Sequence, residues 1–455
     1  MSVEILAILF VFFTFLFLLS GIPVAFILSG SALIFAFIGI YFEAFDSSFL
    51  LAIPSRIYGI MINQNLIAVP LFIFMGLILE KTKIAEQLLL AMNMLYKNTN
   101  GGFAISVVLV GAIMGASTGI VGASVVTLGL LSLPIMLKNK YPADLSCGVI
   151  CASGTLGQII PPSLVLILLA DVLSSAYQQA QLNSGIFSPE TVTISDLFAA
   201  SIIPSLLLPM MYIIYIKFLN FEKLDVQNKI KINSFDNHQF LVAFIPPLLL
   251  IFIVLGSIIF GVATPSEAAA LGSVGALIIS TMQSRLSLDI IRKSTIGTIE
   301  LTSMVFAILI GATFFSLVFR GLEGEELIQA LLVHGPENDY LSLIITLGIM
   351  FLLGFILDFI EIIFIIIPLF GPVLFSFGFD PIWVGILIAM VLQTSFLTPP
   401  FGFSLFYLRG VAPKTIETAE IYKGVLPFII IQVIAILLIF IFPQLTSFIP
   451  ELISN

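Results

Sequence analysis

The chain has 455 residues, of which 60% are hydrophobic and 9% are charged, and its mean hydropathy is +1.20. This composition excludes a water-soluble globular protein, and a net charge of -9 without a basic cluster excludes nucleic-acid binding. The chain is therefore expected in the lipid bilayer. Backbone groups in lipid must be hydrogen-bonded internally, and the apolar runs lack the polar alternation of barrel strands, so we predict an all-α integral membrane protein.

Apolar runs of about 20 residues are long enough to cross the hydrocarbon core, and they predict about ten transmembrane helices. In the first half these runs lie near residues 5–20, 21–40, 66–80, 143–170 and 198–216. In the second half they lie near residues 239–260, 264–281, 294–319, 381–408 and 424–443.

Two further apolar stretches, residues 103–137 and 341–375, are too long for one helix and too short for two spans with a turn. Each predicts a re-entrant hairpin. With both termini outside, all Lys and Arg residues except Arg56 and Arg320 fall on cytoplasmic segments, as the positive-inside rule requires. Basic residues flank the first hairpin and acidic residues the second, so we expect the first to open inward and the second outward.

Residues 1–220 and 239–455 contain the same order of elements, starting from opposite faces, and a polar linker, 221–238, joins them in the cytoplasm. This order predicts two inverted repeats. A sequence echo supports the repeat, since Pro134 and Pro161-Pro162 recur 238 residues later as Pro372 and Pro399-Pro400.

The tandem prolines Pro161, Pro162, Pro399 and Pro400 are expected to break their helices, because proline has no backbone donor. The freed backbone groups then need another partner. A single proline would indicate only a kink. Two symmetric pairs beside hydroxyl-rich segments indicate a secondary transporter, whose broken helices bind ions or substrate near the midplane.

Oxygen-bearing and small residues gather in the hairpins and beside the broken helices. Sodium is a hard cation and prefers several oxygen ligands. The first candidate set for sodium or substrate is Ser117, Thr118, Gly119, Gly122, Ser153 and Thr155. The second is Gly354, Asp358, Gln393, Thr394, Ser395 and Thr398. Close helix packing through small residues is an alternative explanation for segment 111–124.

Asp358 and Glu361 lie in the second hairpin on one helical face. Ionisable groups at membrane depth are costly, which makes both functional candidates. The alternative is that they lie at a hairpin end, where free N–H groups or water satisfy them. Asp358 is the stronger candidate because it aligns with the tip of the first hairpin.

An enzyme is not expected, although residues 115–119 formally match the G-x-S-x-G motif of serine hydrolases. That chemistry needs a general base near the serine. The only histidines, His238 and His334, are predicted in loops on opposite sides of the membrane. No cofactor is expected, and sodium as the coupling ion is the only metal.

The chain resembles the large membrane subunit of tripartite ATP-independent periplasmic (TRAP) transporters over nearly its whole length. The most specific stretches are residues 154–163, GTLGQIIPPS, and 398–406, TPPFGFSLF, supported by Val69–Phe72 and Gly354–Asp358. The external polar segment Asp171–Asp196 departs from the family pattern, because most members have a tight turn there. This departure leaves the substrate open.

The resemblance implies a sodium-coupled elevator-type transporter in the inner membrane of a bacterium or archaeon, importing a small organic acid. It implies two partners: a small membrane subunit of about four helices and a periplasmic substrate-binding protein. Because the two repeats use every apolar run, we expect the chain to depend on these separate partners. The alternative is a stand-alone sodium-coupled anion or dicarboxylate carrier of related fold.

Overall fold

The computed structural model of the chain describes residues 2–96, 99–219, 237–333 and 338–454. Most of the predicted linker and His334 lie outside these residues. Within the described part the chain is helical and contains no strand, which confirms the all-α prediction.

The first half contains ten α-helices: α1 (Val3–Leu18), α2 (Val24–Tyr41), α3 (Ile53–Met61), α4 (Ala68–Lys81), α5 (Ile84–Leu95), α6 (Gly102–Thr118), α7 (Val121–Lys138), α8 (Ala143–Thr155), α9 (Leu164–Asn183) and α10 (Ile194–Phe218). Three short 3-10 helices join them: η1 (Ser47–Ala52), η2 (Asn65–Ile67) and η3 (Leu156–Gln158). The second half contains α11 (Asn237–Ile259), α12 (Pro265–Met282), α13 (Leu288–Gly321), α14 (Gly324–Val333), α15 (Asp339–Leu353), α16 (Phe359–Ser376), α17 (Pro381–Leu397), α18 (Phe403–Val411), α19 (Thr418–Ile441) and α20 (Gln444–Ser454).

Six of the described helices are long and apolar enough to cross a membrane: α2, α7, α10, α13, α16 and α19. A seventh span results if 47–61 and 65–81, which meet at an angle of 57°, are counted together. Five further apolar helices have 10 to 17 residues. The chain is thus a multi-pass membrane protein, and the number of about ten crossings stays a prediction.

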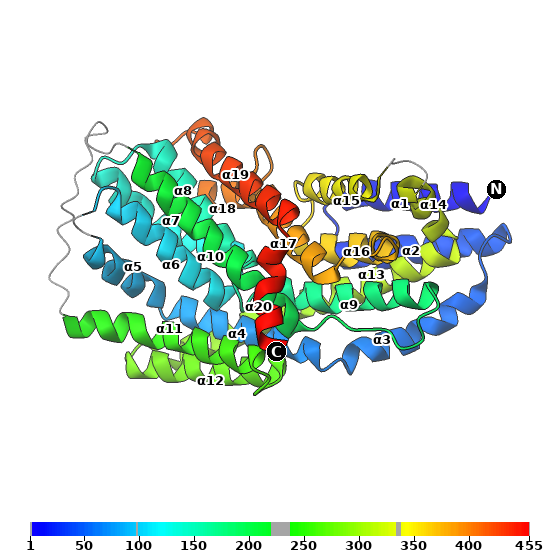
Figure 1. Ribbon diagram of the computed structural model, residues 1–455, viewed down its shortest axis with the longest axis horizontal. Coiled ribbons are helices and arrows are strands. Elements are labelled where there is room, and N and C mark those ends of the chain that lie inside the picture. The colour runs from blue at the N-terminus through cyan, green and yellow to red at the C-terminus, as the bar shows by residue number, and fades with distance from the viewer. Residues whose placement is uncertain (1, 97–98, 220–236, 334–337, 455) are drawn as a thin grey trace.

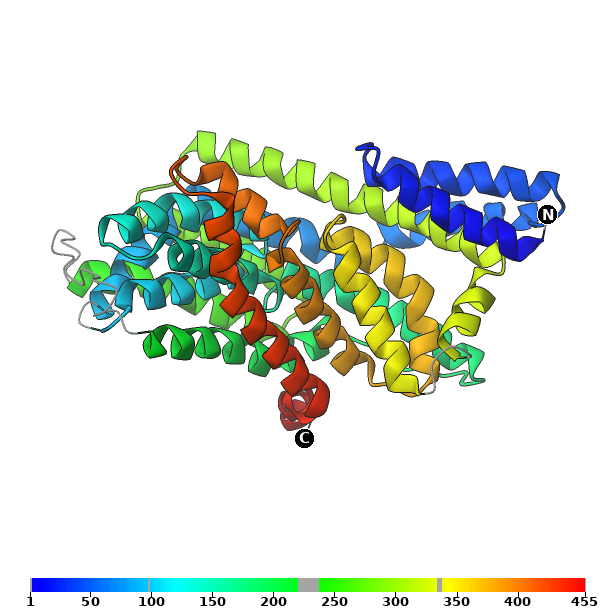
Figure 2. The ribbon, with the colours of Figure 1, turned by 90° about the horizontal axis from the view of Figure 1, so that it is seen from above.

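The long helix α13 connects the two ends of the molecule. It has 34 residues and runs beside α2 toward one end and beside α4 toward the other (Figure 2). Helices α1, α2 and α14 lie at one end of the long axis, and α5, α6 and α11 lie at the opposite end (Figure 1). Helix α13 also contacts α16.

Segments from the two halves of the chain interleave. Helix α9 packs on α16, and α8 packs on α19. Helix starts recur at a constant spacing: the N-cap residues of α7 and α16, Ile120 and Asp358, are 238 residues apart, as are Pro142 and Asp380, the N-caps of α8 and α17. Both tandem proline bonds, Pro161-Pro162 and Pro399-Pro400, are cis.

The external polar segment is shorter than we predicted, because α9 continues through Asp171 to Asn183. Polar residues such as Gln are good helix formers, so polarity alone does not end a helix. Gly185 ends it, with a φ of 82°. The amides of Gly185 and Ile186 donate to the carbonyls of Leu182 and Gln181, which is the Schellman pattern.

Candidate functional site

The two tandem proline pairs lie where helices are interrupted. The first break separates α8 from α9 and contains η3 and residues 159–163, and the second separates α17 from α18 at residues 398–402. In each break a hydroxyl satisfies a carbonyl that the helix has released. Ser163 Oγ donates to the carbonyl of Gln158 over 2.8 Å, and Ser404 Oγ donates to that of Phe396 over 2.7 Å.

The connection between α6 and α7 packs against the first break. The chain turns at Gly119, whose φ is 61°. A Cβ atom on Gly111 would lie 2.6 Å from the Cβ of Ser153, and one on Gly115 would lie 2.6 Å from the backbone nitrogen of Gly157. Real side chains do not fit at such distances, so the close approach requires glycine at both positions. Gly111 and Gly115 therefore serve close helix packing, whereas binding of sodium or substrate by segment 111–124 stays a prediction.

The connection between α15 and α16 packs in a similar way against α17. A Cβ atom on Gly354 would overlap the hydroxyl of Ser395. At the start of α16, Asp358 Oδ1 accepts a 2.7 Å hydrogen bond from the Phe359 amide, and Glu361 Oε2 accepts one of 3.1 Å from the Asp358 amide. The Asp358 side chain also accepts from the Glu361 amide, and together with the bond from the Asp358 amide to Glu361 this forms a capping box. Free N–H groups thus satisfy both carboxylates, and a role for Asp358 in binding stays a prediction.

The candidate hydroxyls donate hydrogen bonds to carbonyls of their own helices. In the first set, Ser117 and Thr118 both donate to Met114, Ser153 to Val149, and Thr155 to Ala152. In the second, Thr394 donates to Met390, Ser395 to Leu392, and Thr398 to Thr394. A hydroxyl that donates its proton in this way keeps its lone pairs for a cation.

The structure does not bring every candidate to the same place. Gly122, at the start of α7, faces α18 instead, where a Cβ atom would lie 2.9 Å from the ring of Tyr407. Gly119 lies against the start of α9, where a Cβ atom on this glycine would be 3.1 Å from the Leu164 nitrogen. Gln393, Thr394 and Ser395 are buried together in α17.

Two buried glutamines stand out because neither amide has a hydrogen-bond partner among the described residues. Gln158 lies in the first break and Gln393 on α17 before the second, and both side chains are 0% exposed. A buried amide without partners costs about 1–3 kcal/mol, so such groups mark places that suit a polar ligand. Gln393 belongs to the predicted set, but Gln158 was missed. Its position three residues before Pro161 could have pointed to it.

The ligand chemistry of these breaks favours a hard cation of low charge. They offer hydroxyl, amide and backbone carbonyl oxygens, which suit sodium better than a transition metal. Within the described ranges no group of three or more His, Cys, Asp or Glu side chains could hold a metal ion.

Comparison with known proteins identifies the family. The profile described as "Tripartite ATP-independent periplasmic transporter, DctM component" matches residues 10–445. The C4-dicarboxylate TRAP transporter large permease protein DctM of Pseudomonas aeruginosa is 26% identical over 392 residues, 86% of this chain and 87% of that protein. The sialic acid TRAP transporter large permease protein SiaM of Vibrio cholerae is 26% identical over 440 residues, 96% of each chain. The ectoine/5-hydroxyectoine large permease protein UehC of Ruegeria pomeroyi is 28% identical over 392 residues, 85% of this chain and 86% of that protein.

Two solved transporters share the fold. The YdaH transporter of Alcanivorax borkumensis aligns with a TM-score of 0.64 over 97% of this chain and 99% of its own, at 13% identity. MtrF of Neisseria gonorrhoeae aligns with a TM-score of 0.56 over 86% of this chain and 83% of its own, also at 13% identity. The sequence relatives are permease subunits, which confirms the prediction that this chain is not an enzyme. The chain belongs to the DctM family and is a large membrane subunit of a TRAP transporter.

Proposed function

We propose that this subunit couples the import of a small organic acid to sodium entry. The observation that carries the proposal is the pair of helix breaks at Pro161-Pro162 and Pro399-Pro400. The α6–α7 connection packs against the first break, the α15–α16 connection packs against α17 just before the second, and a buried glutamine without partners among the described residues accompanies each. Permeases named for C4-dicarboxylates and sialic acid are among the relatives, and both are carboxylic acids.

Sodium would bind among hydroxyl oxygens whose hydrogen atoms already donate to backbone carbonyls of the same helix. Ser117 and Thr155 offer hydroxyl lone pairs near the first break, and Ser395 and Thr398 do so near the second. The Gln158 and Gln393 amides can add a further oxygen at each break. Four helices, α7, α9, α16 and α18, begin at the breaks or at the facing connections. Their N-termini carry partial positive charge, which can hold the carboxylate of the substrate.

Transport would follow an elevator mechanism. The carrier unit comprises the hairpins near 103–137 and 341–375 with the broken helices, and it would move past a scaffold that includes α2, α4, α12 and α13. The helix pairs α6–α7 and α15–α16 cover these two stretches, which supports the prediction of two hairpins. The 238-residue spacing of helix starts supports two inverted repeats, 1–220 and 239–455.

The family relationship supports a tripartite assembly in the inner membrane. This chain would pair with a small membrane subunit of about four helices and would receive its substrate from a periplasmic binding protein. Both termini would then lie on the periplasmic side. The stand-alone carrier is the competing proposal, and reconstitution with and without the partners separates the two.

Sodium coupling is tested by the sodium concentration that gives half-maximal uptake. Replacing Ser117 or Thr398 by Ala should raise this concentration about tenfold, because one hydrogen-bond-like contact to a charge contributes about 1.5 kcal/mol. Buried hydroxyls with the same intrahelical bond provide the controls: Ser106→Ala in α6 and Thr346→Ala in α15 should leave it unchanged. Equal uptake in sodium-free, proton-driven conditions would refute the proposal.

A further inference from the structure

A cavity of about 340 Å³ lies between α3, α9, α13 and α16, away from the helix breaks. Arg56, Asp171, Thr313 and Arg320 contribute to its wall, and Pro368 and Pro372 close it from α16. These prolines are 10 and 14 residues beyond Asp358, roughly 15–20 Å along the helix axis. An adjoining cavity of about 730 Å³ shares Arg56 and Asp171.

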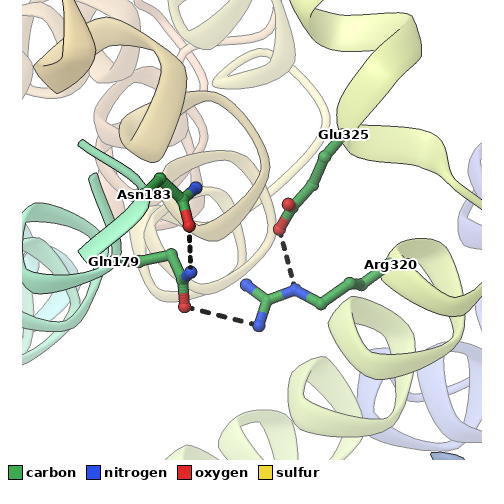
Figure 3. A network of polar contacts seen from close by, with 4 residues as sticks. All are labelled: Gln179, Asn183, Arg320 and Glu325. Carbon is green, nitrogen blue, oxygen red and sulfur yellow. Dashed lines mark hydrogen bonds and ion pairs between the residues drawn. The ribbon is translucent and has the colours of Figure 1, made fainter. Parts of the chain in front are cut away.

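The cavity brings together the two basic residues that the charge pattern predicts on the outer side, Arg56 and Arg320. The charge of Arg320 is already compensated. Its Nε lies 2.7 Å from Glu325 Oε1, and its Nη1 donates to Gln179 Oε1 over 3.5 Å (Figure 3). Gln179 in turn donates to Asn183 over 2.8 Å. This network fixes Arg320 at the junction of α13, α14 and α9.

Arg56 differs from Arg320, because it forms no hydrogen bond or ion pair with any residue in the described part of the chain. Its side chain is half-buried in the wall of both cavities. Its guanidinium therefore keeps five donors for another partner.

Asp171 is the only acidic side chain in the described wall of either cavity. Asn63 Nδ2 donates to Asp171 Oδ1 over 2.7 Å, and no described cationic group lies within 4.0 Å of the carboxylate. Arg56 and Asp171 thus line the same cavity without neutralising each other. Half-buried charges are costly unless they are paired or solvated, and a ligand that pairs with both would relieve both costs at once.

We propose that this cavity binds a small zwitterionic solute, whose carboxylate pairs with Arg56 and whose cationic group pairs with Asp171. An anion alone would gain the contact with Arg56 but would lie beside the Asp171 carboxylate, and a cation alone would meet the reverse problem. Polar side chains of Ser175, Thr313 and Ser316 complete the wall. The site is separate from the helix breaks, and its occupation does not depend on sodium-coupled transport.

Direct binding to the purified chain in lipid nanodiscs tests the proposal, with isothermal titration calorimetry as the readout. The central probe is 4-aminobutyrate, compared with butyrate and butylammonium, which each lack one of its charges. The distance between Arg56 and Asp171 sets how far apart the two charges of the best ligand must be. The series therefore also includes ω-amino acids of other chain lengths, from glycine to 6-aminohexanoate. At least one should bind tenfold or more tightly than its two singly charged analogues.

Variants assign the two charges. Arg56→Gln should weaken the best ω-amino acid at least tenfold, whereas Arg56→Lys should retain most of the affinity. Asp171→Asn should weaken the zwitterion yet strengthen butyrate, a reversal that a purely structural role of Asp171 would not produce. Lys217→Gln, at an exposed position of α10, is the matched control for the loss of a positive charge.

Two results would overturn the proposal: no ω-amino acid binds to the wild-type chain, or none of them binds more tightly than its two singly charged analogues. Both comparisons use the wild-type chain, so they decide the question even if a variant fails to fold. Thr398→Ala should leave 4-aminobutyrate binding unchanged. Failure of the zwitterion site and failure of sodium coupling are thereby distinguishable.

Discussion

Gly115 and Gly157 meet backbone to backbone, so that a Cβ atom on Gly115 would lie 2.6 Å from the Gly157 nitrogen and one on Gly157 would lie 2.9 Å from the Gly115 Cα. The first residue belongs to α6 and the second to η3 at the first helix break. The contact therefore joins the connection between α6 and α7 to the Pro161-Pro162 break. Any side chain at either position must push these two segments apart.

Gly115→Ala should destabilise the protein by about 1–3 kcal/mol, because inserting a methyl group into a closely packed contact forces the backbone to move. The midpoint of thermal unfolding in detergent measures the effect, and uptake should fall with it. Gly348→Ala is the control, since a Cβ atom on Gly348 has no heavy atom within 4 Å. Equal midpoints for the two variants would show that the contact does not constrain the fold.

Asp358 should cap α16 through an oxygen atom, and a role in binding should need this oxygen but not the negative charge. Asp358→Asn keeps an oxygen that can accept the 2.7 Å bond from the Phe359 amide, so stability and uptake should stay near the wild type. Asp358→Ala removes the acceptor and should cost about 1 kcal/mol in the free energy of unfolding. A stable but inactive Asn variant would instead assign the carboxylate charge to transport.

The orientation in the membrane can be tested with single cysteines, after Cys147 and Cys151 have been replaced by Ala. Cysteines at the exposed positions Ser184 and Thr415 should react with an impermeant thiol reagent from opposite faces. The physical reason is the positive-inside rule, which places the basic segment around Thr415 in the cytoplasm. Labelling of both positions from the same face would contradict the topology.

Much of the fold follows from where apolar runs begin and end. The starts of α6 and α15, Gly102 and Asp339, lie within two residues of the predicted hairpin starts at 103 and 341, because hydropathy marks where both apolar stretches begin. The bend of 57° before α4 was not predicted. The short amphipathic helices α5 and α14 were missed for a different reason, since a search for apolar runs passes over helices that are polar on one face.

The candidate site was predicted only in part. Ser395 and Gly354 could be grouped because Ser395 lies shortly before Pro399-Pro400 and Gly354 begins the segment Gly354–Asp358. The structure places the two residues in contact. The cavity that contains Arg56 and Asp171 could not be predicted, because hydropathy does not report which helices face each other. For the same reason the sequence could not show that Gly122 faces Tyr407, which belongs to the other half of the chain.

This subunit is proposed to work in a sodium-driven tripartite assembly. The most direct test is uptake into proteoliposomes with an inward sodium gradient, measured for this chain with and without the small membrane subunit and the substrate-loaded binding protein. We expect uptake only when both partners are present, and none when the sodium gradient is replaced by a proton gradient. Equal uptake of free substrate by this chain alone would contradict the tripartite assembly and favour a stand-alone carrier.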